Sequence, residues 1–231
     1  MKLNFEGKVI LVTGSSRGIG KQIYEDFKSL GGEVIGLSSK DCDFSNPEEV
    51  QHRFSQRTLG IDWNKIDVLV NNAGINKIAT FENISYEDYT DIMNVNLHAP
   101  FLISQEISKI MKKNKYGRIV NISSIWGTKT KERRAAYTTS KSAINGLTKT
   151  MSVELARYNI LVNTVSPGFT MTEMTEKILT KAEKLALMSQ VPVRRFATVS
   201  DISKAVMFLA SDLNTYITGQ DLKVDGGFSN V

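Results

Sequence analysis

The run Lys8-Val-Ile-Leu-Val-Thr13 continues directly into Gly14-Ser-Ser-Arg17-Gly18-Ile19-Gly20, and this stretch decides the fold. Its first half is short, apolar and β-branched, which is typical of a strand buried on both faces. Its second half is a glycine-rich turn before a helix that we expect from about residue 18 to residue 30. Such a turn lets a phosphate approach the backbone, where the helix N-terminus offers free N–H groups. Any tight turn favours glycine, but the position between a strand and a helix predicts dinucleotide binding.

Strand-like and helix-like segments alternate along the rest of the chain. Apolar runs predict further strands at residues 33–37, 67–71, 118–122, 160–165 and 221–224. Helical patterns predict a helix at about 87–112, bent near Pro100, and others at about 136–158 and 201–210. This alternation indicates βαβ units and therefore an α/β fold with a parallel sheet covered on both faces. Ligands of such sheets bind beyond the carboxyl ends of the strands.

Composition limits the classes of protein and site. The 231 residues are 41% hydrophobic and 23% charged, as in ordinary globular proteins with a sizeable core. No apolar run approaches the ~20 residues of a membrane helix, and the first six residues contain no apolar stretch of a signal peptide, so we expect a cytoplasmic protein. The single cysteine, Cys42, excludes an internal disulfide, and the isolated His52 and His98 argue against zinc. We expect no metal site.

The net charge of +5 comes partly from basic runs at residues 112–115 and 129–134. Runs of this kind are usually solvated faces. Nucleic-acid binding would require basic residues interleaved with aromatic ones in a recognisable module, which this sequence does not contain. The second run precedes Tyr137 closely, so we treat it as a candidate for attracting an anionic substrate.

Tyr137 and Lys141 are the most informative pair of polar residues. Their spacing places them on one face of the predicted helix, one turn apart. An ammonium close to a phenol favours the phenolate, so we expect the pKa of Tyr137 to fall toward working pH. A tyrosine with such a pKa can exchange a proton with a substrate oxygen. Ser124 lies thirteen residues before the tyrosine, at the end of a predicted strand.

The choice of dinucleotide depends on the end of the second predicted strand. NAD-binding proteins generally have a carboxylate there for the ribose hydroxyls. This chain has Ser38-Ser39-Lys40 instead, and Arg17 of the glycine turn can reach the same place. Hydroxyls and cations suit the additional phosphate of NADP, so we favour NADP. Asp41 keeps NAD as an alternative, because a shift of register would place its carboxylate near the ribose.

Together these residues resemble the short-chain dehydrogenase/reductase family. The matching motifs follow the family's order and spacing over the whole chain: Thr13-Gly14-xxx-Gly18-x-Gly20, Asn71-Asn72-Ala73-Gly74, Asn94-Val-Asn96-Leu, Ile122-Ser-Ser124, Tyr137-xxx-Lys141, Pro167-Gly168 and Val224-Asp225-Gly226-Gly227. The resemblance implies one Rossmann-type, doubly wound parallel sheet flanked by helices. It also implies a single dinucleotide-binding and catalytic domain, residues 1–231, with a small lid at about 173–193.

The resemblance also assigns roles to individual residues. Tyr137 would be the acid/base, and Lys141 would hold the nicotinamide ribose and lower the tyrosine's pKa. Ser124 would bond the substrate oxygen, and Asn96 would hold a water that links Lys141 to solvent. The cofactor contacts carried over by motif or expected from the chain are Gly14, Ser16, Arg17, Gly18, Ile19, Gly20, Ser38, Ser39, Lys40, Asp43, Asn72, Ala73, Gly74, Tyr137, Lys141, Pro167, Gly168, Thr170 and Thr172.

The chain departs from the family pattern after its second strand. Family members have a strand–helix–strand unit between this strand and the aspartate that contacts the adenine, which here is Asp43. Only residues 38–42 intervene in this chain, so we expect one helix to be missing. The rim around the adenosine should be shorter, and the catalytic residues should be unaffected.

Several residues are candidates for the substrate side. Residues 173–190 predict an amphipathic lid helix, and Trp126 is expected to face the pocket. Lys131, Arg133 and Arg134 are expected around its mouth. The segment 191–196 is similar to the one after the lid in bacterial 3-oxoacyl-carrier reductases. The basic run at 112–115, with Arg157, would suit an acyl carrier protein, although it would equally suit solvent.

The leading hypothesis is an NADP-dependent reductase that reversibly converts a ketone or aldehyde into an alcohol. A 3-oxoacyl thioester and an acidic sugar or sugar nucleotide both stay open as substrates. The alternative is a non-catalytic, dinucleotide-sensing regulatory protein on the same fold, which would be free to lose the four catalytic residues that this chain keeps. An epimerase or dehydratase of the extended relatives would need a longer substrate domain. The segment 224–227 resembles a part packed between subunits in the family, so we expect a homodimer or homotetramer.

Overall fold

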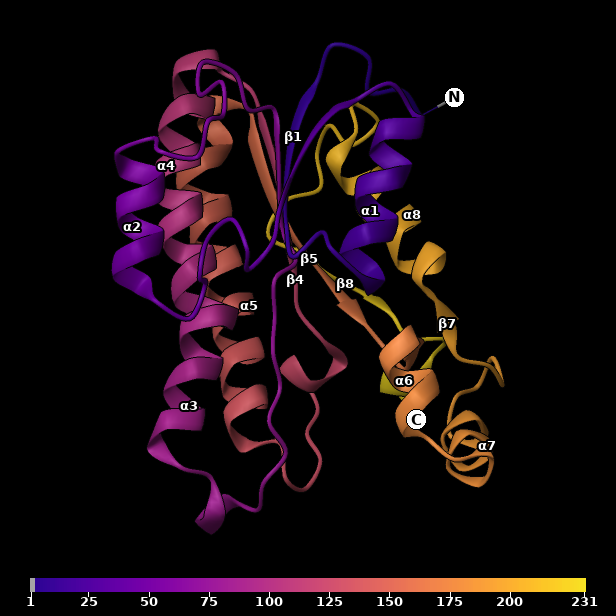
Figure 1. Cartoon of the computed structure of the whole chain (residues 1–231). Coiled ribbons are helices and arrows are strands. Elements are labelled where there is room, and N and C mark those ends of the chain that lie inside the picture. The colour runs from indigo at the N-terminus through magenta and orange to yellow at the C-terminus, as the bar shows by residue number, and fades with distance from the viewer. Residues whose placement is uncertain (1–2) are drawn as a thin grey trace.

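A six-stranded sheet forms the centre of the computed structural model, with the strands in the order β2-β1-β3-β4-β5-β8 (Figure 1). All five pairings between neighbouring strands are parallel. The strands are β1 (Val9–Thr13), β2 (Glu33–Leu37), β3 (Val68–Asn71), β4 (Gly117–Ile122), β5 (Ile160–Pro167) and β8 (Asp221–Val224). The Rossmann-type, doubly wound sheet expected from the sequence is therefore confirmed, with strand bounds close to the predicted ones.

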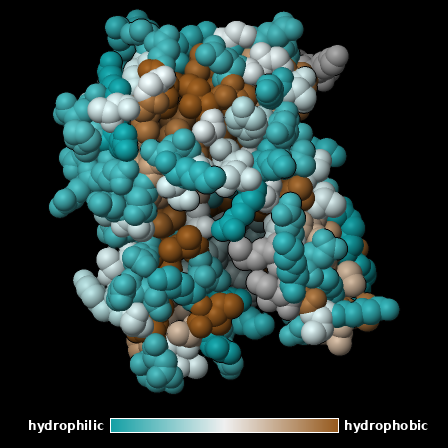
Figure 2. Space-filling model, in the orientation of Figure 1, coloured by the Kyte–Doolittle hydropathy of each residue, from teal (hydrophilic) through white to brown (hydrophobic). Residues whose placement is uncertain are grey.

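The structure describes residues 3–231, with the side chains of residues 174 and 178 left out. The first two residues of the expected domain, and two side chains of the expected lid, therefore lie outside the described residues. Among residues 3–231, no helix is both long enough and apolar enough to cross a bilayer. The face seen in Figure 2 is mostly hydrophilic, and its hydrophobic residues form separate patches.

Helices cover both faces of the sheet (Figure 1). One face carries α1 (Gly18–Ser29) and α8 (Val199–Ala210), and the other carries α2 (Pro47–Ser55), α3 (Tyr86–Met93), α4 (Ala99–Asn114) and α5 (Ala135–Leu155). Alternation along β1 explains both cores. Ile10 and Val12 pack with residues of α1 and α8, whereas Leu11 between them packs with residues of α2 and α4. A strand buried on both faces reads as a continuous apolar run.

The expected long helix from 87 to 112 is interrupted, as the bend near Pro100 suggested. A five-residue π segment, Asn94–His98, joins α3 to α4, and Pro100 lies in the first turn of α4. Proline has no N–H to donate and is tolerated there. Short 3₁₀ turns lie elsewhere along the chain: Phe81–Asn83 before α3, Ile125–Gly127 after β4, Ala156–Tyr158 after α5 and Phe228–Asn230 near the C-terminus.

The prediction of one lid helix over residues 173–190 was wrong. Two short helices, α6 (Glu173–Ile178) and α7 (Lys181–Ser189), occupy this region. Thr180 begins the second helix with a capping box, in which Thr180 and Glu183 each bond the other's backbone N–H. A two-stranded parallel sheet of β6 (Thr170–Met171) and β7 (Ala197–Thr198) flanks the two helices.

The connection after β2 is short, in agreement with the expected missing helix. The structure has neither helix nor strand between Leu37 and Pro47, and α2 follows directly. Asn46 caps α2 by accepting hydrogen bonds from the backbone N–H groups of Glu48 and Glu49. As a result, β2 is an edge strand of the sheet.

Candidate active site

The glycine turn between β1 and α1 fits a dinucleotide. Gly14 has φ +67°, and a Cβ there would lie 2.8 Å from the Cα of Ala73. A Cβ on Gly20 would lie 2.2 Å from the carbonyl oxygen of Gly14, so the turn can only close on glycine. The first turn of α1 contains no acidic residue, and Arg17 at the N-cap makes no capping bond. The N–H groups at this helix end are therefore available to a pyrophosphate.

The loop after β3 is tied to the glycine turn. Thr13 Oγ1 accepts hydrogen bonds from the backbone N–H groups of Asn72 (3.0 Å) and Ala73 (3.1 Å). The side-chain amide of Asn72 donates to the carbonyl oxygens of Thr13 and Gly14, at 3.0 Å each. Asn72 thus holds two cofactor loops together through its side chain. Thr13 opens a motif noted in the sequence but was given no role there, although a hydroxyl at the end of the first strand was a usable signal.

Tyr137, Lys141 and Ser124 meet beyond the carboxyl end of β4. Tyr137 and Lys141 share one face of α5, with Lys141 Nζ 5.7 Å from the centre of the Tyr137 ring. Lys141 is 4% exposed, and its Nζ donates to the carbonyl oxygen of Ile122 at 2.8 Å. Ser124 lies two residues after β4, and its hydroxyl is close enough to Tyr137 to lower the pKa of the phenol. The helical spacing therefore brings the three residues together as the sequence predicted.

Asn96 lies beside them in the π segment, a feature that often marks functional sites. Its amide makes three hydrogen bonds: Oδ1 accepts from the N–H of Ile75, and Nδ2 donates to Ile75 O (2.9 Å) and to Ser140 Oγ (3.1 Å). A Cβ on Gly74 would lie 3.4 Å from Asn96 Oδ1 and 3.6 Å from Lys141 Nζ, so the three residues are neighbours. The water-holding role of Asn96 stays a prediction.

The expected fall in the pKa of Tyr137 was wrong for the protein alone. Burial raises the pKa of this phenol and is the largest effect. A hydrogen bond with Ser124 and the charge of Arg134 lower it to a smaller degree. Burial also lowers the pKa of Lys141 to about 8. The neighbouring cation is visible in the sequence, whereas the burial that desolvates both groups depends on the folded structure.

The carboxylate of Asp41 lies in the turn that follows β2. Asp41 Oδ2 accepts from the backbone N–H and the hydroxyl of Ser38, at 2.8 Å each. The backbone bond to Ser38 is the main cause that holds the pKa of Asp41 below its usual value. Ser39 and Lys40 are exposed, as is Arg17 of the glycine turn. Lys40 and the competing Asp41 therefore lie on one short, open turn, and Arg17 lies on the glycine turn.

Asp43, the expected adenine contact, is exposed and caps the next turn. Its Oδ1 accepts from the backbone N–H (2.9 Å) and the hydroxyl (2.7 Å) of Ser45.

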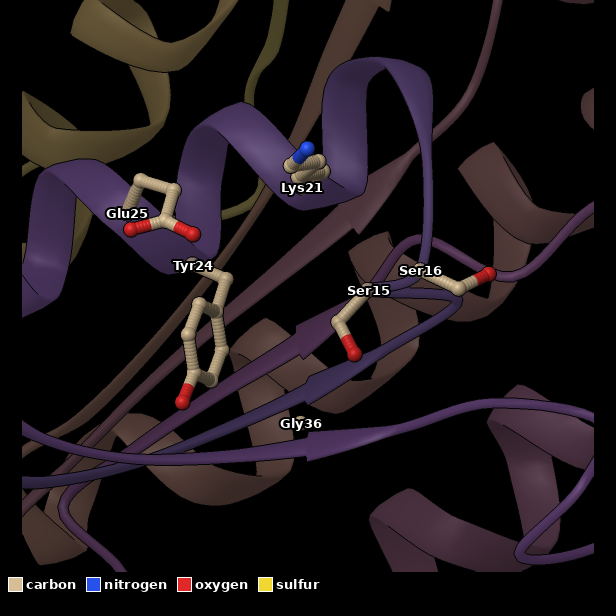
Figure 3. Close-up of a pocket in the computed structure, with 6 residues that line it drawn as sticks. All are labelled: Ser15, Ser16, Lys21, Tyr24, Glu25 and Gly36. Atoms are coloured by element: carbon tan, nitrogen blue, oxygen red, sulfur yellow. The ribbon is translucent and has the colours of Figure 1, made fainter.

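A pocket of about 260 Å³ opens between the glycine turn and β2. Its lining consists of Ser15, Ser16, Lys21, Tyr24, Glu25 and Gly36. Figure 3 shows Ser15 and Tyr24 extending toward the strand at Gly36, where a Cβ would lie 2.5 Å from the Ser15 hydroxyl. Of these residues, only Ser16 was expected from the sequence to contact the cofactor. The spacing of Lys21, Tyr24 and Glu25 on one face of α1 was the signal that could have found them.

The loops after β5 supply the remaining expected cofactor contacts. Pro167 ends β5 and is buried, and a Cβ on Gly168 would lie 2.7 Å from the Cα of Asp225. Thr170 donates to the carbonyl oxygen of Gly168 at 3.1 Å. Thr172 caps α6, and its methyl group lies 3.9 Å from where a Gly18 Cβ would be. Thr172 therefore adjoins the glycine turn.

Trp126 and the basic run before α5 follow Ser124 along the chain. Trp126 contacts Phe169 and Phe228 edge to face, with ring centres 6.2 and 6.0 Å apart. Lys131 and Arg133 are exposed, whereas Arg134 is partly buried and influences the pKa of Tyr137. In residues 3–231, apart from the two omitted side chains, no group of three or more metal-binding side chains is present.

Known proteins match this arrangement over nearly the whole chain. A family model described as enoyl-(acyl carrier protein) reductase matches residues 5–229. The 3-oxoacyl-[acyl-carrier-protein] reductase FabG of Aquifex aeolicus is 37% identical, covering 98% of this chain and 99% of the relative.

Solved structures agree with the sequence relatives. A gluconate 5-dehydrogenase from Burkholderia cenocepacia, in complex with NADP and tartrate, has a TM-score of 0.90 at 27% identity and covers 99% of this chain and 98% of its own. A 4-hydroxyisoleucine dehydrogenase complexed with NADH has a TM-score of 0.89 at 33% identity and covers 97% of this chain and 100% of its own. The chain belongs to the short-chain dehydrogenase/reductase family of NAD(P)-dependent oxidoreductases.

Proposed function

We propose that this enzyme reversibly reduces a ketone or aldehyde to an alcohol with NADPH. The observation that carries the proposal is the assembly of Ser124, Tyr137 and Lys141 beside the glycine turn. When bound, the nicotinamide supplies the hydride. A non-catalytic sensor would not need these side chains in one place, so the enzymatic hypothesis is preferred.

The roles of the residues follow from the charge that develops on the substrate. Hydride addition to a carbonyl carbon creates an alkoxide, which requires a hydrogen-bond donor and a proton at one point. Tyr137 would donate the proton, and Ser124 would bond the same oxygen. The pKa of Lys141 at about 8 keeps its ammonium mostly charged at neutral pH, so it can both hold the ribose and favour the tyrosinate that remains. Asn96 would position the loop at Ile75 that adjoins Lys141.

NADP is favoured by the cations at the open end of β2. Lys40 is exposed there, and Ser38 and Ser39 provide hydroxyls. Arg17 is exposed on the glycine turn, from which it would reach the same phosphate. Lys21, in the pocket beside the same strand, adds a third cation that the additional phosphate would meet. Asp41 opposes this choice by placing a carboxylate on Ser38. NAD therefore stays as the weaker alternative.

The substrate class has two candidates. The FabG relative is named for a 3-oxoacyl group on an acyl carrier protein, whereas the solved relatives are named for gluconate and 4-hydroxyisoleucine. Each name describes an oxygen-bearing carbon that can be oxidised or reduced. The basic, exposed Lys131 and Arg133 suit an anionic substrate in either case.

The lid, the oligomeric state and the cellular location belong to the same proposal. Helices α6 and α7 would form the lid of a single domain, since they follow the loop that adjoins the glycine turn. A homodimer or homotetramer would cover exposed apolar side chains such as Val153 (81%), Phe101 (46%) and Leu222 of the edge strand β8 (38%). The cytoplasm is proposed as the location, in keeping with a free, buried Cys42.

The test is a reductase assay that follows loss of reduced-cofactor absorbance with NADPH and NADH. Acetoacetyl thioesters of coenzyme A and of an acyl carrier protein form one set of substrates, and 5-oxogluconate with shorter oxo acids forms the other. We expect turnover in one set and a lower KM for NADPH than for NADH. A protein that binds NADPH but turns over nothing in either set, in either direction, would contradict the proposal.

A further inference from the structure

Arg134 differs from every other basic residue around the catalytic group. It is the N-cap residue of α5, three positions before Tyr137. Its Nε and Nη1 are shielded from solvent, and no acceptor in the described part of the chain bonds to them. A buried N–H without an acceptor costs free energy, so such a group in a native structure calls for an explanation. A ligand that supplies the acceptor is one.

The charge of Arg134 acts at the reacting hydroxyl. This cation lowers the pKa of Tyr137, and Tyr137 in turn counteracts the fall that burial causes in the pKa of Arg134. The other charged residue that acts on the pKa of Arg134 is Arg133, which has the same sign. Among the residues that the structure describes, no carboxylate forms an ion pair with either arginine. Arg134 is thus an uncompensated cation beside the candidate acid/base.

The backbone holds Arg134 in this place. Arg133 has φ +65°, a left-handed conformation that costs free energy for a non-glycine residue and is often found at functional sites. This turn leaves Lys131 and Arg133 exposed, while the next side chain is partly buried. The first turn of α5 contains no acidic residue, so the positive end of the helix dipole adds to the charge of Arg134.

We propose that Arg134 binds the carboxylate of a small oxo or hydroxy acid, whose reacting carbon lies at Ser124 and Tyr137. The inference rests on the proposed function and narrows its substrate class. A guanidinium is a planar donor that matches a carboxylate in geometry and charge. A 3-oxoacyl thioester offers only a neutral carbonyl oxygen in place of the carboxylate, so the charge of Arg134 would stay uncompensated. Arg134 therefore selects the acidic substrates over the thioesters.

The experiment compares oxo acids with their own methyl esters. Acetoacetate, levulinate and 5-oxohexanoate place the carboxylate at three distances from the ketone, and each ester removes the charge while keeping the ketone. We expect the wild-type enzyme to prefer at least one acid over its ester in kcat/KM. Arg134→Gln should lower kcat/KM for that acid by about 10- to 100-fold, mainly through KM, because a charge-assisted bond to the substrate is lost. The ester should change by less than about threefold, and Arg134→Lys should restore part of the loss.

The matched control is Arg57→Gln, which removes the same charge from an exposed residue just after α2. It should leave the preference for the acid unchanged. Melting temperatures of all variants with bound NADPH confirm that the comparison is made on folded protein.

The possible outcomes distinguish a failure of the inference from a failure of the proposed function. Loss confined to the acid supports the inference. Equal losses for acid and ester, with a pH profile shifted upward for both, would mean that Arg134 acts only by lowering the pKa of Tyr137, and the inference would fail while the proposed function stood. A wild-type enzyme that prefers every ester, or accepts only acetoacetyl thioesters, would also overturn it. Absence of turnover with all ketones, or full activity of Tyr137→Phe, would overturn the proposed function itself.

Discussion

The catalytic end and the adenosine end of this site lie at the same edge of one sheet but are held very differently. Lys141 lies on the 21-residue helix α5, donates to the carbonyl of Ile122 and accepts a bond from the Ser123 hydroxyl through its own carbonyl. Both partners belong to or follow the central strand β4. The adenosine end is a short, exposed turn after the edge strand β2, closed by Asp41 on Ser38.

This difference indicates where substitutions can be made with little loss of stability or activity. A strand with neighbours on both sides and a long helix fix the positions of the reacting groups, which catalysis requires to within a fraction of an ångström. An edge turn that bonds mainly to itself can alter its charges without disturbing the core. We therefore expect substitutions at the catalytic end to affect rate and stability strongly, and those at the adenosine end to affect cofactor choice weakly.

Tyr137→Phe should produce the largest effect. Removing the hydroxyl takes away the proton donor, so kcat should fall by about 10²- to 10⁴-fold, with little change in the affinity for NADPH. Single-turnover kinetics and a fluorescence titration of NADPH measure the two quantities. A variant that keeps the wild-type rate would show that another group transfers the proton.

The positions of the catalytic residues could be predicted from the sequence, but their pKa values and burial could not. The pairing of Tyr137 with Lys141 follows from helix geometry, and Ser124 joins them because carboxyl ends of parallel strands share one edge. The direction of the Tyr137 pKa did not follow, because burial is set by residues distant in the sequence. The orphaned nitrogens of Arg134 were equally hidden, since its two basic neighbours look the same in the sequence and are exposed in the structure.

In the fold too, features set by the local sequence were predicted, and features that depend on contacts in the folded chain were not. Residues 33–37 and 221–224 were predicted with their observed bounds, because short apolar runs bounded by turn residues have little freedom. The lid was taken as one helix because helical periodicity continues through Thr180, whose capping role depends on a hydrogen bond with Glu183. Asp41 was correctly identified as a competing feature, and its bond to Ser38 required the folded turn.

Lys141→Met should stabilise the protein while it impairs the reaction. The pKa of Lys141 falls from 10.5 to about 8 on burial, which corresponds to about 3 kcal/mol of destabilisation at pH 7. The hydrogen bond to Ile122 is lost in the variant, so we expect a net gain of about 1–3 kcal/mol in the free energy of unfolding. Urea denaturation at pH 7 measures this gain, and steady-state assays should show a loss of at least ~10²-fold in kcat/KM.

The pH dependence gives this prediction its sign. Between pH 8 and 10.5 the folded wild-type protein loses the Lys141 proton while the unfolded chain keeps it, so wild-type stability should rise through this window. The advantage of Lys141→Met should therefore shrink on going from pH 7 to pH 10. Lys149→Met, at an exposed position on the same helix, should show neither effect. A constant difference between the two pH values would contradict the assigned burial cost.

Gly14→Ala should have an intermediate effect on stability and on NADPH binding. The new Cβ would meet the Cα of Ala73 at 2.8 Å, at a position with φ +67°. We expect a loss of ~1–3 kcal/mol in the free energy of unfolding and weaker binding of NADPH, because the turn cannot close. Gly146→Ala is the matched control, since nothing lies within 4 Å of a Cβ there and the residue is helical. It should stabilise the protein by up to ~1 kcal/mol, so thermal denaturation should give shifts of opposite sign.

Asp41→Asn should have the smallest effect and should be confined to cofactor choice. The amide oxygen of asparagine can still accept from the N–H of Ser38, so the turn keeps its shape, while the negative charge near the additional phosphate of NADP disappears. Exposed charges act through water, and a change of about 0.5–1 kcal/mol corresponds to a roughly two- to fivefold increase in the ratio of kcat/KM for NADPH to that for NADH. Glu48→Gln, an exposed carboxylate in the first turn of α2, controls for net charge and should leave the ratio unchanged.

If Asp41 instead holds the ribose hydroxyls of NADH, the variant should lose NADH activity by more than tenfold with no gain for NADPH. That result would mean that the edge strand keeps the carboxylate as its cofactor ligand, and that Arg17 and Lys40 only face solvent.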